Sequence, residues 1–578
     1  MPRQRYLTLQ EAVDMVMNDL DSVDGDIDVV SIPPDDSDED EGNDECTGVA
    51  EVADVPGEVE VHFQTPSTED NTPPPKKKRR TDQGAPTWRK QQPEYTGWQA
   101  PSNGPEEARE KIASELSGST AVEIFEKIFT PEVFHLIQLE TLRYARDVKN
   151  DQLFSLSDHE LKAFIGILLY SGYNPLPSER MYWSKDDDLA RPIVRQAMTR
   201  SDYLKIKSYF HVQDNNKQQE TKDRGFKVRP LLDMINKSFQ QFGVFQSKLA
   251  VDEMIVRYYG HNSLKQFIRG TPIRFGYKLW AVCGSDGYCY KFDLYCGKEE
   301  RPELRDQPLG TRVVMDMLSV VSDPGGHEVF FDNLFTSRSL LAQLKDRGVR
   351  ATGTVRKNRL DKCPVTERKK MAKSRRGSYE QRFDRTSEVL LVRWHDNKVV
   401  NVMTNYDAAD PPTSTTRYDR TAKKRLPIPQ PKVLKTYNTG MGGVDLHDQL
   451  LGAYEVAIRG KKWYWCLITR MLDMAVVNSH ILHKTAATGD QLSLINFRRE
   501  IATTYLKAAA CERDAARPLP SHIPASLRYD GVGHMLAPLN ARRRCQLESC
   551  KLRSTKRCIK CDVAICFKCF AVYHGLSP

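Results

Sequence analysis

Three aspartates stand where the character of the chain changes, and they limit the possible fold more than any other feature. Asp252 and Asp332 each end a short apolar run of the kind that forms a buried strand. Asp445 follows Gly-Gly-Val, and Asp448 comes one helical turn later, on the same side of a predicted helix. A single aspartate in such a place is more often a turn or capping residue. The joint pattern instead predicts a site for two Mg2+ ions that carries out phosphodiester chemistry.

The order of the predicted elements indicates the fold around these acids. The strand that carries Asp252 is followed by a hairpin over 277–295, a helix near 311–321 and the strand that delivers Asp332. This order predicts an RNase H-like α/β core, in which the first and fourth strands are adjacent and bring their acids together. Because Asp445 comes much later in the chain, a basic, β-rich insertion is expected between the two parts of the core.

Length and periodicity predict a multidomain α+β protein. A chain of 578 residues is too long for one core, and helical periodicity flanks the strand-rich region on both sides. The expected parts are a disordered acidic tail (1–105), a helical domain for dimerisation and DNA binding in two parts (106–245 and 457–530), the catalytic core in two parts (246–357 and 431–456), the insertion (358–430) and a zinc-binding, cysteine-rich domain (534–578).

Charge and composition point to a polyanionic partner. The net charge is +8 with 28% charged residues, and no segment reaches the roughly 18 apolar residues of a membrane span, so no membrane partner is expected. The tail has eight acids and no base between Asp35 and Glu45. It also holds five consecutive bases that predict recognition by a nuclear import receptor and a nuclear location, rather than a generic solvated charge run: Lys76, Lys77, Lys78, Arg79 and Arg80.

Cysteine spacing predicts a metal-binding module at the C-terminus. Six of the 13 cysteines lie within a short segment, and a histidine follows them; these ligands are Cys545, Cys550, Cys558, Cys561, Cys566, Cys569 and His574. Thiolate and imidazole ligands at this spacing indicate structural Zn2+, which takes four ligands in a closed tetrahedron.

Four short motifs follow one another along the chain. They are Val251-Asp252-Glu253, Phe331-Asp332-Asn333-Leu334-Phe335-Thr336-Ser337, Gly353-Thr354-Val355-Arg356-Lys357-Asn358 and Gly442-Gly443-Val444-Asp445-Leu446-His447-Asp448-Gln449. In this order they resemble the piggyBac family of DNA transposases, and the resemblance covers about residues 110–574. It implies that Asp252, Asp332 and Asp445 form the metal-binding catalytic set, with Asp448 as a fourth acid tied to the same site.

The resemblance also implies a reaction and its partners. A piggyBac-type transposase nicks double-stranded DNA at the terminal inverted repeats of its transposon, forms hairpin ends, and joins them to a TTAA target. Each step is an in-line phosphoryl transfer, so one two-metal site can repeat it without a covalent protein nucleophile. Because two ends must be cut together, we expect a homodimer or a larger assembly.

The expected DNA contacts lie in two places. Trp463 matches a family tryptophan placed near the transposon end and could stack on a displaced base; packing in the core is the alternative. Arg459, Lys461 and Lys462 precede it and could hold phosphates.

The C-terminal module is the second place. Between Ala541 and His574 there are nine bases, Arg542, Arg543 and Arg544 among them, and two acids, which favours reading of the terminal repeats over binding of a histone tail or another protein. A cross-braced pair of zinc ions, as in the family, would need eight ligands, and His534 is the nearest candidate for the eighth. The first cysteine pair departs from the commoner Cys-x2-Cys, so the pairing of the ligands stays open.

Two functions compete for this sequence. One is an active cut-and-paste transposase, which the presence of all four acids favours. The other is a transposase-derived protein that binds DNA or chromatin without cutting it. A structure-selective nuclease that uses the same core has no support beyond the core itself.

Overall fold

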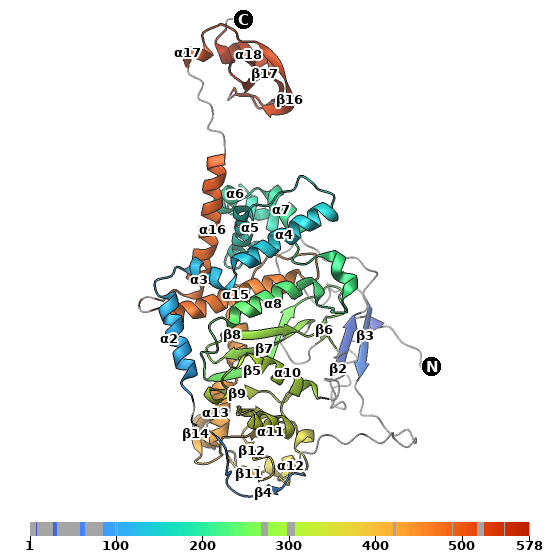
Figure 1. The fold of residues 1–578 in the computed structure, drawn as a ribbon, viewed down its shortest axis with the longest axis vertical. Helices are drawn as coiled ribbons and strands as arrows, with labels where there is room; N and C mark the ends of the chain where they lie inside the picture. The colour runs from blue at the N-terminus through green and yellow to red at the C-terminus, as the bar shows by residue number, and fades with distance from the viewer. Residues whose placement is uncertain are drawn as a thin grey trace, which may run out of the picture. The chain divides into compact units, whose positions relative to one another are not determined.

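The computed structural model describes residues 85–98, 100, 102–267, 275–297, 307–419, 423–487, 489, 491–516, 525–547 and 549–576, and the backbone of three short strands, β1 (Leu7–Thr8), β2 (Ile27–Ser31) and β3 (Glu58–Phe63). The chain forms two compact units, Met1–Ala510 and Cys511–Pro578. The architecture is mixed α and β with several domains, as the sequence predicts (Figure 1). The import signal predicted at 76–80 lies outside the described residues.

A mixed sheet forms the centre of the first unit. Its middle strands are β8 (Cys289–Leu294), β7 (Phe275–Gly284), β5 (Lys248–Arg257), β9 (Glu328–Phe331) and β10 (Arg350–Thr354). β5 pairs parallel with β9, and β9 with β10, whereas β7 and β8 run antiparallel to their neighbours. The short β6 (Gln266–Phe267) also pairs with β7. The predicted hairpin and the adjacency of the strands that lead to Asp252 and Asp332 are therefore confirmed.

Helices precede the sheet, as the periodicity predicts. They are α2 (Gly104–Leu116), α3 (Ala121–Ile128), α4 (Pro131–Asp147), α5 (Asp158–Ser171), α6 (Pro192–Ala197), α7 (Arg200–Tyr209) and α8 (Arg229–Gln240). A capping box of Ser157 and Glu160 starts α5, where it satisfies amide groups that a helix N-terminus leaves free. α8 lies against β8, and α10 (Leu309–Met317) joins the hairpin to β9.

The C-terminal part of the first unit returns to the same sheet. α13 (Lys432–Gly440) contacts β9, and α14 (Gly443–Ala453) lies across β5 and β7. The next helices are α15 (Trp465–Ala486) and α16 (Leu494–Ala516). α15 is buried on nearly all sides and packs against α2, α3 and α8, so the helices from both ends of the chain share one core. Among the described residues, no helix is long and apolar enough to span a membrane.

The predicted insertion is β-rich: its first three strands extend the central sheet, and its last two strands pair with each other in a separate two-stranded sheet. Its elements are α12 (Arg368–Met371), β11 (Tyr379–Asp384), β12 (Val389–His395), β13 (Val399–Thr404), β14 (Thr413–Asp419) and β15 (Lys424–Gln430). β13 pairs antiparallel with β10, which would otherwise be an edge strand with unpaired backbone groups. In β12, Leu391 belongs to the main core, while Leu390 and Val392 belong to a second apolar cluster.

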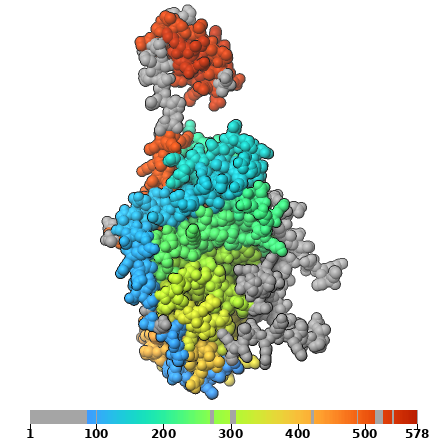
Figure 2. Space-filling model, viewed as in Figure 1, coloured from blue at the N-terminus to red at the C-terminus, as the bar shows by residue number. Residues whose placement is uncertain are grey.

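The segment 85–98, which we call the strap, corrects the predicted extent of the tail. The prediction places residues through 105 in a disordered tail, yet β4 (Trp88–Arg89) pairs with β11 and covers the outer edge of the sheet. Tyr95 donates a hydrogen bond to the carbonyl of Asp407 and packs edge-on against Phe383. The strap (blue) adjoins the insertion (yellow) at one end of the first unit (Figure 2).

The second unit is small and rich in cysteine. It contains α17 (Ala525–Arg528), β16 (Leu536–Arg544), β17 (Arg553–Cys558), β18 (Val563–Ala564) and α18 (Phe567–His574). The three strands form an antiparallel sheet in chain order. Its buried cluster consists mainly of cysteine side chains with Val563, Ile565 and Tyr573, so apolar packing alone gives this unit little stability.

Candidate functional site

The parallel pairing of β5 and β9 brings two of the predicted acids together. Val251 pairs in register with Phe331. Asp252 follows Val251 in the chain, and Asp332 follows Phe331. Asp332 follows the end of β9, whereas β5 continues to Arg257, so Asp252 lies within its strand and not at its end as the sequence predicts. The parallel register nevertheless makes the two acids neighbours across the sheet. Asp252 and Asp332 are each half-buried, which leaves their carboxyl groups within reach of solvent and ions.

A close approach of α14 to the hairpin places Asp445 beside them. A Cβ atom on Gly443 would lie 2.5 Å from the carbonyl oxygen of Gly284, so only glycine lets the helix begin there. One turn on, the buried ring of His447 contacts the carbonyl oxygen of Gly287 through Nδ1 at 2.8 Å. These contacts fix the first turn of α14, which carries the exposed Asp445 on a third element.

The electrostatics of Asp252 link it to both of the other acids. Burial raises the pKa of Asp252 to about 7, the backbone N–H of Glu253 opposes this, and the negative charges of Asp332 and Asp445 raise it further. Like charges held this close favour a proton or a cation in their midst. Carboxylate oxygens at such a point are suitable ligands for a hard divalent cation.

The Gly353-Thr354 motif supports Asp332. The Thr354 hydroxyl donates to Asp332 Oδ1 at 3.2 Å, and the Thr336 hydroxyl donates to the Asp332 carbonyl at 2.8 Å. A Cβ atom on Gly353 would lie 2.2 Å from Thr336 Oγ1, so glycine is needed where β10 passes this turn.

Asp448 lies at the margin of the cluster, where it contacts a cation of the protein itself. Its Oδ1 is 3.5 Å from Nη1 of Arg470, a buried side chain that also faces Glu455 at 3.8 Å. Burial raises the pKa of Asp448, while Arg470 opposes this shift and the charges of Glu455 and Asp445 add to it. The structure therefore brings all four predicted acids to one region, with Asp448 already partnered by an arginine.

Two contributors to this site have no local sequence signal. Tyr437 on α13 lies close enough to Asp332, Asp252 and Asp445 for their charges, together with burial, to raise its pKa. His447 contacts a residue 160 positions away in the chain. Their contributions depend on packing between distant segments, so the prediction from the sequence does not include them.

The residues predicted to contact DNA in the first unit point in different directions. Trp463 is half-buried, with its ring centroid 5.9 Å from that of Tyr277. Lys461 is exposed and Arg459 is half-exposed. Lys462, in contrast, turns its ammonium group into the protein, so the structure does not present it as a surface cation.

The predicted ligands of the second unit gather into two groups of four. The ligand atoms within each group lie within 4.8 Å of one another; one group is Cys545, Cys550, Cys566 and Cys569, and the other is His534, Cys558, Cys561 and His574. The two groups alternate along the chain, and the histidines of one group stand singly before the first cysteine pair and after the last, which is a cross-braced arrangement. His534 lies with three of the predicted ligands, where it could supply the eighth.

Both histidines are oriented as metal ligands. Nδ1 of His574 contacts the carbonyl of Arg528 at 3.0 Å, and its buried Nε2 has no hydrogen-bond partner among the described residues. His534 has the opposite arrangement: Nε2 faces the Asp530 carboxylate at 3.0 Å, and Nδ1 lies 3.4 Å from Cys558 Sγ. In a metal-bound histidine, a hydrogen-bond partner usually holds one imidazole nitrogen, while the other nitrogen binds the metal. Each group could therefore hold a metal ion.

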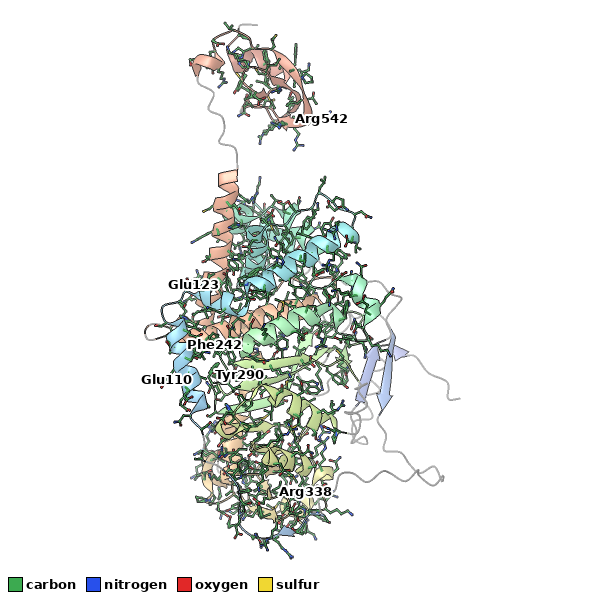
Figure 3. The ribbon with its side chains drawn as sticks, viewed as in Figure 1. Glu110, Glu123, Phe242, Tyr290, Arg338 and Arg542 are labelled. Carbon is green, nitrogen blue, oxygen red and sulfur yellow. The ribbon has the colours of Figure 1, made fainter. Side chains whose placement is uncertain are left out.

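Three consecutive basic side chains of the second unit lie at the end of its strand β16. Arg542, Arg543 and Arg544 are all exposed, and Figure 3 labels Arg542 at the surface of this unit. They are free to meet a polyanion while the cysteine groups hold the fold.

Comparison with known proteins identifies the class and then the family. The family model for transposase IS4 matches residues 120–480. The fold is similar to a chain in the cryo-EM structure of a piggyBac transposase synaptic complex with hairpin DNA, with a TM-score of 0.61 and 19% identity over 78% of this chain and 96% of that chain. Fold and matched domain together define a transposase-derived protein.

Two human relatives give the family. PiggyBac transposable element-derived protein 2 is 35% identical over 491 residues, covering 84% of this chain and 81% of the relative. PiggyBac transposable element-derived protein 3 is 34% identical over 460 residues, covering 79% and 76%. The chain belongs to the piggyBac transposase family, which confirms the resemblance read from its motifs.

Proposed function

We propose that this protein is a metal-dependent DNA transposase of the piggyBac type, which excises DNA through hairpin ends and inserts it at TTAA targets. The observation that carries the proposal is the meeting of Asp252, Asp332 and Asp445 from two parallel strands and one helix. The strand order β8-β7-β5-β9-β10, with β5, β9 and β10 parallel, supports an RNase H-like core.

The acid cluster fits a pair of Mg2+ ions. When bound, they would activate the attacking oxygen and stabilise the leaving oxygen of a phosphodiester. Asp252, Asp332 and Asp445 hold the cations, the Thr354 hydroxyl orients the Asp332 carboxylate, and Asp448 lies beside them with Arg470. No protein nucleophile is required, because water and then a DNA 3′-hydroxyl attack in turn.

The surfaces for DNA are assigned from exposure and charge. Trp463, Arg459 and Lys461 would meet the transposon end near the core. The second unit, held by two Zn2+ ions in its four-ligand groups, would read the terminal inverted repeats with Arg542, Arg543 and Arg544. Cutting two ends together calls for a homodimer, and the bases 76–80 would direct the protein to the nucleus through an import receptor.

A second function has a specific observation in its favour. Both human relatives are named as transposable element-derived proteins. A protein of that kind would keep the DNA-binding surfaces and the zinc-held unit and bind DNA or chromatin without cutting it.

Strand cleavage separates the two functions. The purified full chain is incubated in Mg2+ with duplex DNA from the regions that flank its coding sequence, with Asp332→Asn and the exposed Asp316→Asn as matched variants. If the protein is a transposase, the wild type and Asp316→Asn should produce nicks with 3′-hydroxyl ends and hairpin ends. Asp332→Asn should produce neither product. Binding without cleavage by the wild type would reject the transposase and favour the second function.

A further inference from the structure

Lys462 caps the C-terminal end of a helix that is distant in the sequence. It lies in the loop 454–464, between α14 and α15. Its ammonium group donates hydrogen bonds to the carbonyl oxygens of Ser208 and Phe210, both at 2.9 Å. These carbonyls belong to the last turn of α7 and its C-cap, where a helix has unpaired acceptors and a partial negative charge.

Aromatic side chains complete the site of this ammonium group. Lys462 Nζ is 4.9 Å from the ring centroid of Tyr144 and 3.3 Å from Nδ1 of His211. The His211 ring stacks on Tyr144 at 3.6 Å, and its Nε2 is 3.0 Å from the hydroxyl of the buried Tyr464. Two carbonyls, an aromatic face and an imidazole therefore surround the cation from α4, α7 and the residues after α7.

The other end of the loop is also fastened to the core. The backbone N–H of Val456 donates to the Asp473 carboxylate at 3.0 Å, and that of Ala457 donates to the Ser171 hydroxyl at 3.2 Å. The indole N–H of Trp465 donates to the Ile458 carbonyl at 2.9 Å. The loop is thus held on both sides of its tip.

The tip itself is folded tightly over an indole ring. A Cβ atom on Gly460 would lie 2.3 Å from the Trp465 ring, so the backbone touches this side chain directly. With Lys462 turned inward, the neighbours on each side of it face outward: Lys461 is exposed and Trp463 is half-buried against Tyr277.

We propose that Lys462 is a positioning residue: it clamps the α14–α15 loop to the end of α7, sets Lys461 and Trp463 at the surface, and makes no contact with a DNA phosphate. The proposal rests on the proposed function only in taking that surface to be one that binds DNA. It also separates two adjacent lysines, since Lys461 remains the one that can neutralise a phosphate.

Two measurements on matched variants test this assignment. The first is the salt dependence of binding to a mixed-sequence DNA duplex, because each neutralised phosphate contributes about 0.9 to the slope of log affinity against log salt concentration. We expect Lys461→Met to lower the slope by about this amount, and Lys462→Met to leave it at the wild-type value.

The second measurement is amide hydrogen exchange in residues 454–464. Loss of the clamp in Lys462→Met should speed exchange there by about tenfold or more, since two charge-assisted hydrogen bonds are lost. Lys461→Met should leave it unchanged. Tyr464→Phe removes the contact to His211 without changing the charge, and it should also speed exchange in this loop. This variant replaces Lys462→Met in the test if Lys462→Met does not fold.

The outcomes are distinct. A reduced salt slope in Lys462→Met equal to that of Lys461→Met overturns the proposal, and so does unchanged loop exchange in both Lys462→Met and Tyr464→Phe. If the wild type binds no DNA, the proposed function fails, while hydrogen exchange still decides whether Lys462 acts as a clamp.

Discussion

At the scale of single residues, the acid cluster depends on positions that carry no charge. Gly443 allows α14 to start against the backbone of Gly284, and His447 fixes the next turn on Gly287. The orientation of Asp445 is therefore set by its neighbours on the helix.

Gly443→Ala tests this dependence. The new methyl group would meet a backbone carbonyl at 2.5 Å, which cannot give way, so α14 must shift. We expect loss of Mg2+-dependent cleavage and a destabilisation of about 1–3 kcal/mol, measured by strand cleavage and by urea unfolding. Gly452→Ala on the same helix meets nothing within 4 Å and should be neutral or slightly stabilising. Full activity of Gly443→Ala would show that the start of α14 is not constrained.

The residues that could be predicted from the sequence are those with a local signature. Asp252 and Asp332 end apolar runs, and the metal ligands of the second unit have short spacings. Tyr437 and His447 could not be predicted, because their neighbours come from segments far away in the chain. Lys462 was predicted as a phosphate contact because a basic run is taken as surface, whereas the carbonyls at the end of α7 bind it internally.

At the scale of elements, the strands of the core could be predicted, but the partners of its edges could not. Alternating and apolar runs marked β5, the β7–β8 hairpin and β12. The pairing of β13 with β10 and of β4 with β11 leaves no such signal, because it depends on backbone groups that any sequence offers. The first three strands of the insertion and β4 of the strap therefore belong to one sheet with the core.

The backbone N–H of Thr87 allows a test of how the strap is held to the sheet. The buried carboxylate of Asp384 accepts from the backbone N–H of Thr87 at 2.7 Å and from Arg338, labelled in Figure 3, at 3.1 Å. Thr87→Pro removes the N–H and should lower the free energy of unfolding by about 1–3 kcal/mol, because a buried acceptor loses a donor. Thr87→Val keeps the N–H and should cost less than half as much in the same urea titration. Equal losses in both variants would mean that the side chain, and not the backbone, holds the strap.

At the scale of the whole molecule, two units rely on different sources of stability. The first has a large apolar core, and the second has a small one, so we expect it to depend on metal ions held by its two ligand groups. The grouping of ligands makes a spectroscopic prediction: after replacement of the metal by Co2+, one site has four sulfur ligands and the other has two sulfur and two nitrogen ligands. Optical absorption of the Co2+ protein distinguishes these two sites from an arrangement in which each site has three sulfur ligands and one nitrogen ligand. The spectrum of that second arrangement would disprove the grouping.

The most direct test of the acid cluster is the binding of a divalent cation, because it requires no particular DNA sequence. Mn2+ is titrated calorimetrically into the zinc-loaded protein at pH 8, above the pKa of about 7 of Asp252. Wild type and Asp316→Asn should bind Mn2+ alike, and Asp252→Asn, Asp332→Asn and Asp445→Asn should each weaken binding by more than about tenfold. Unchanged binding in these three variants, or an equal loss in Asp316→Asn, would contradict a cation site formed by Asp252, Asp332 and Asp445.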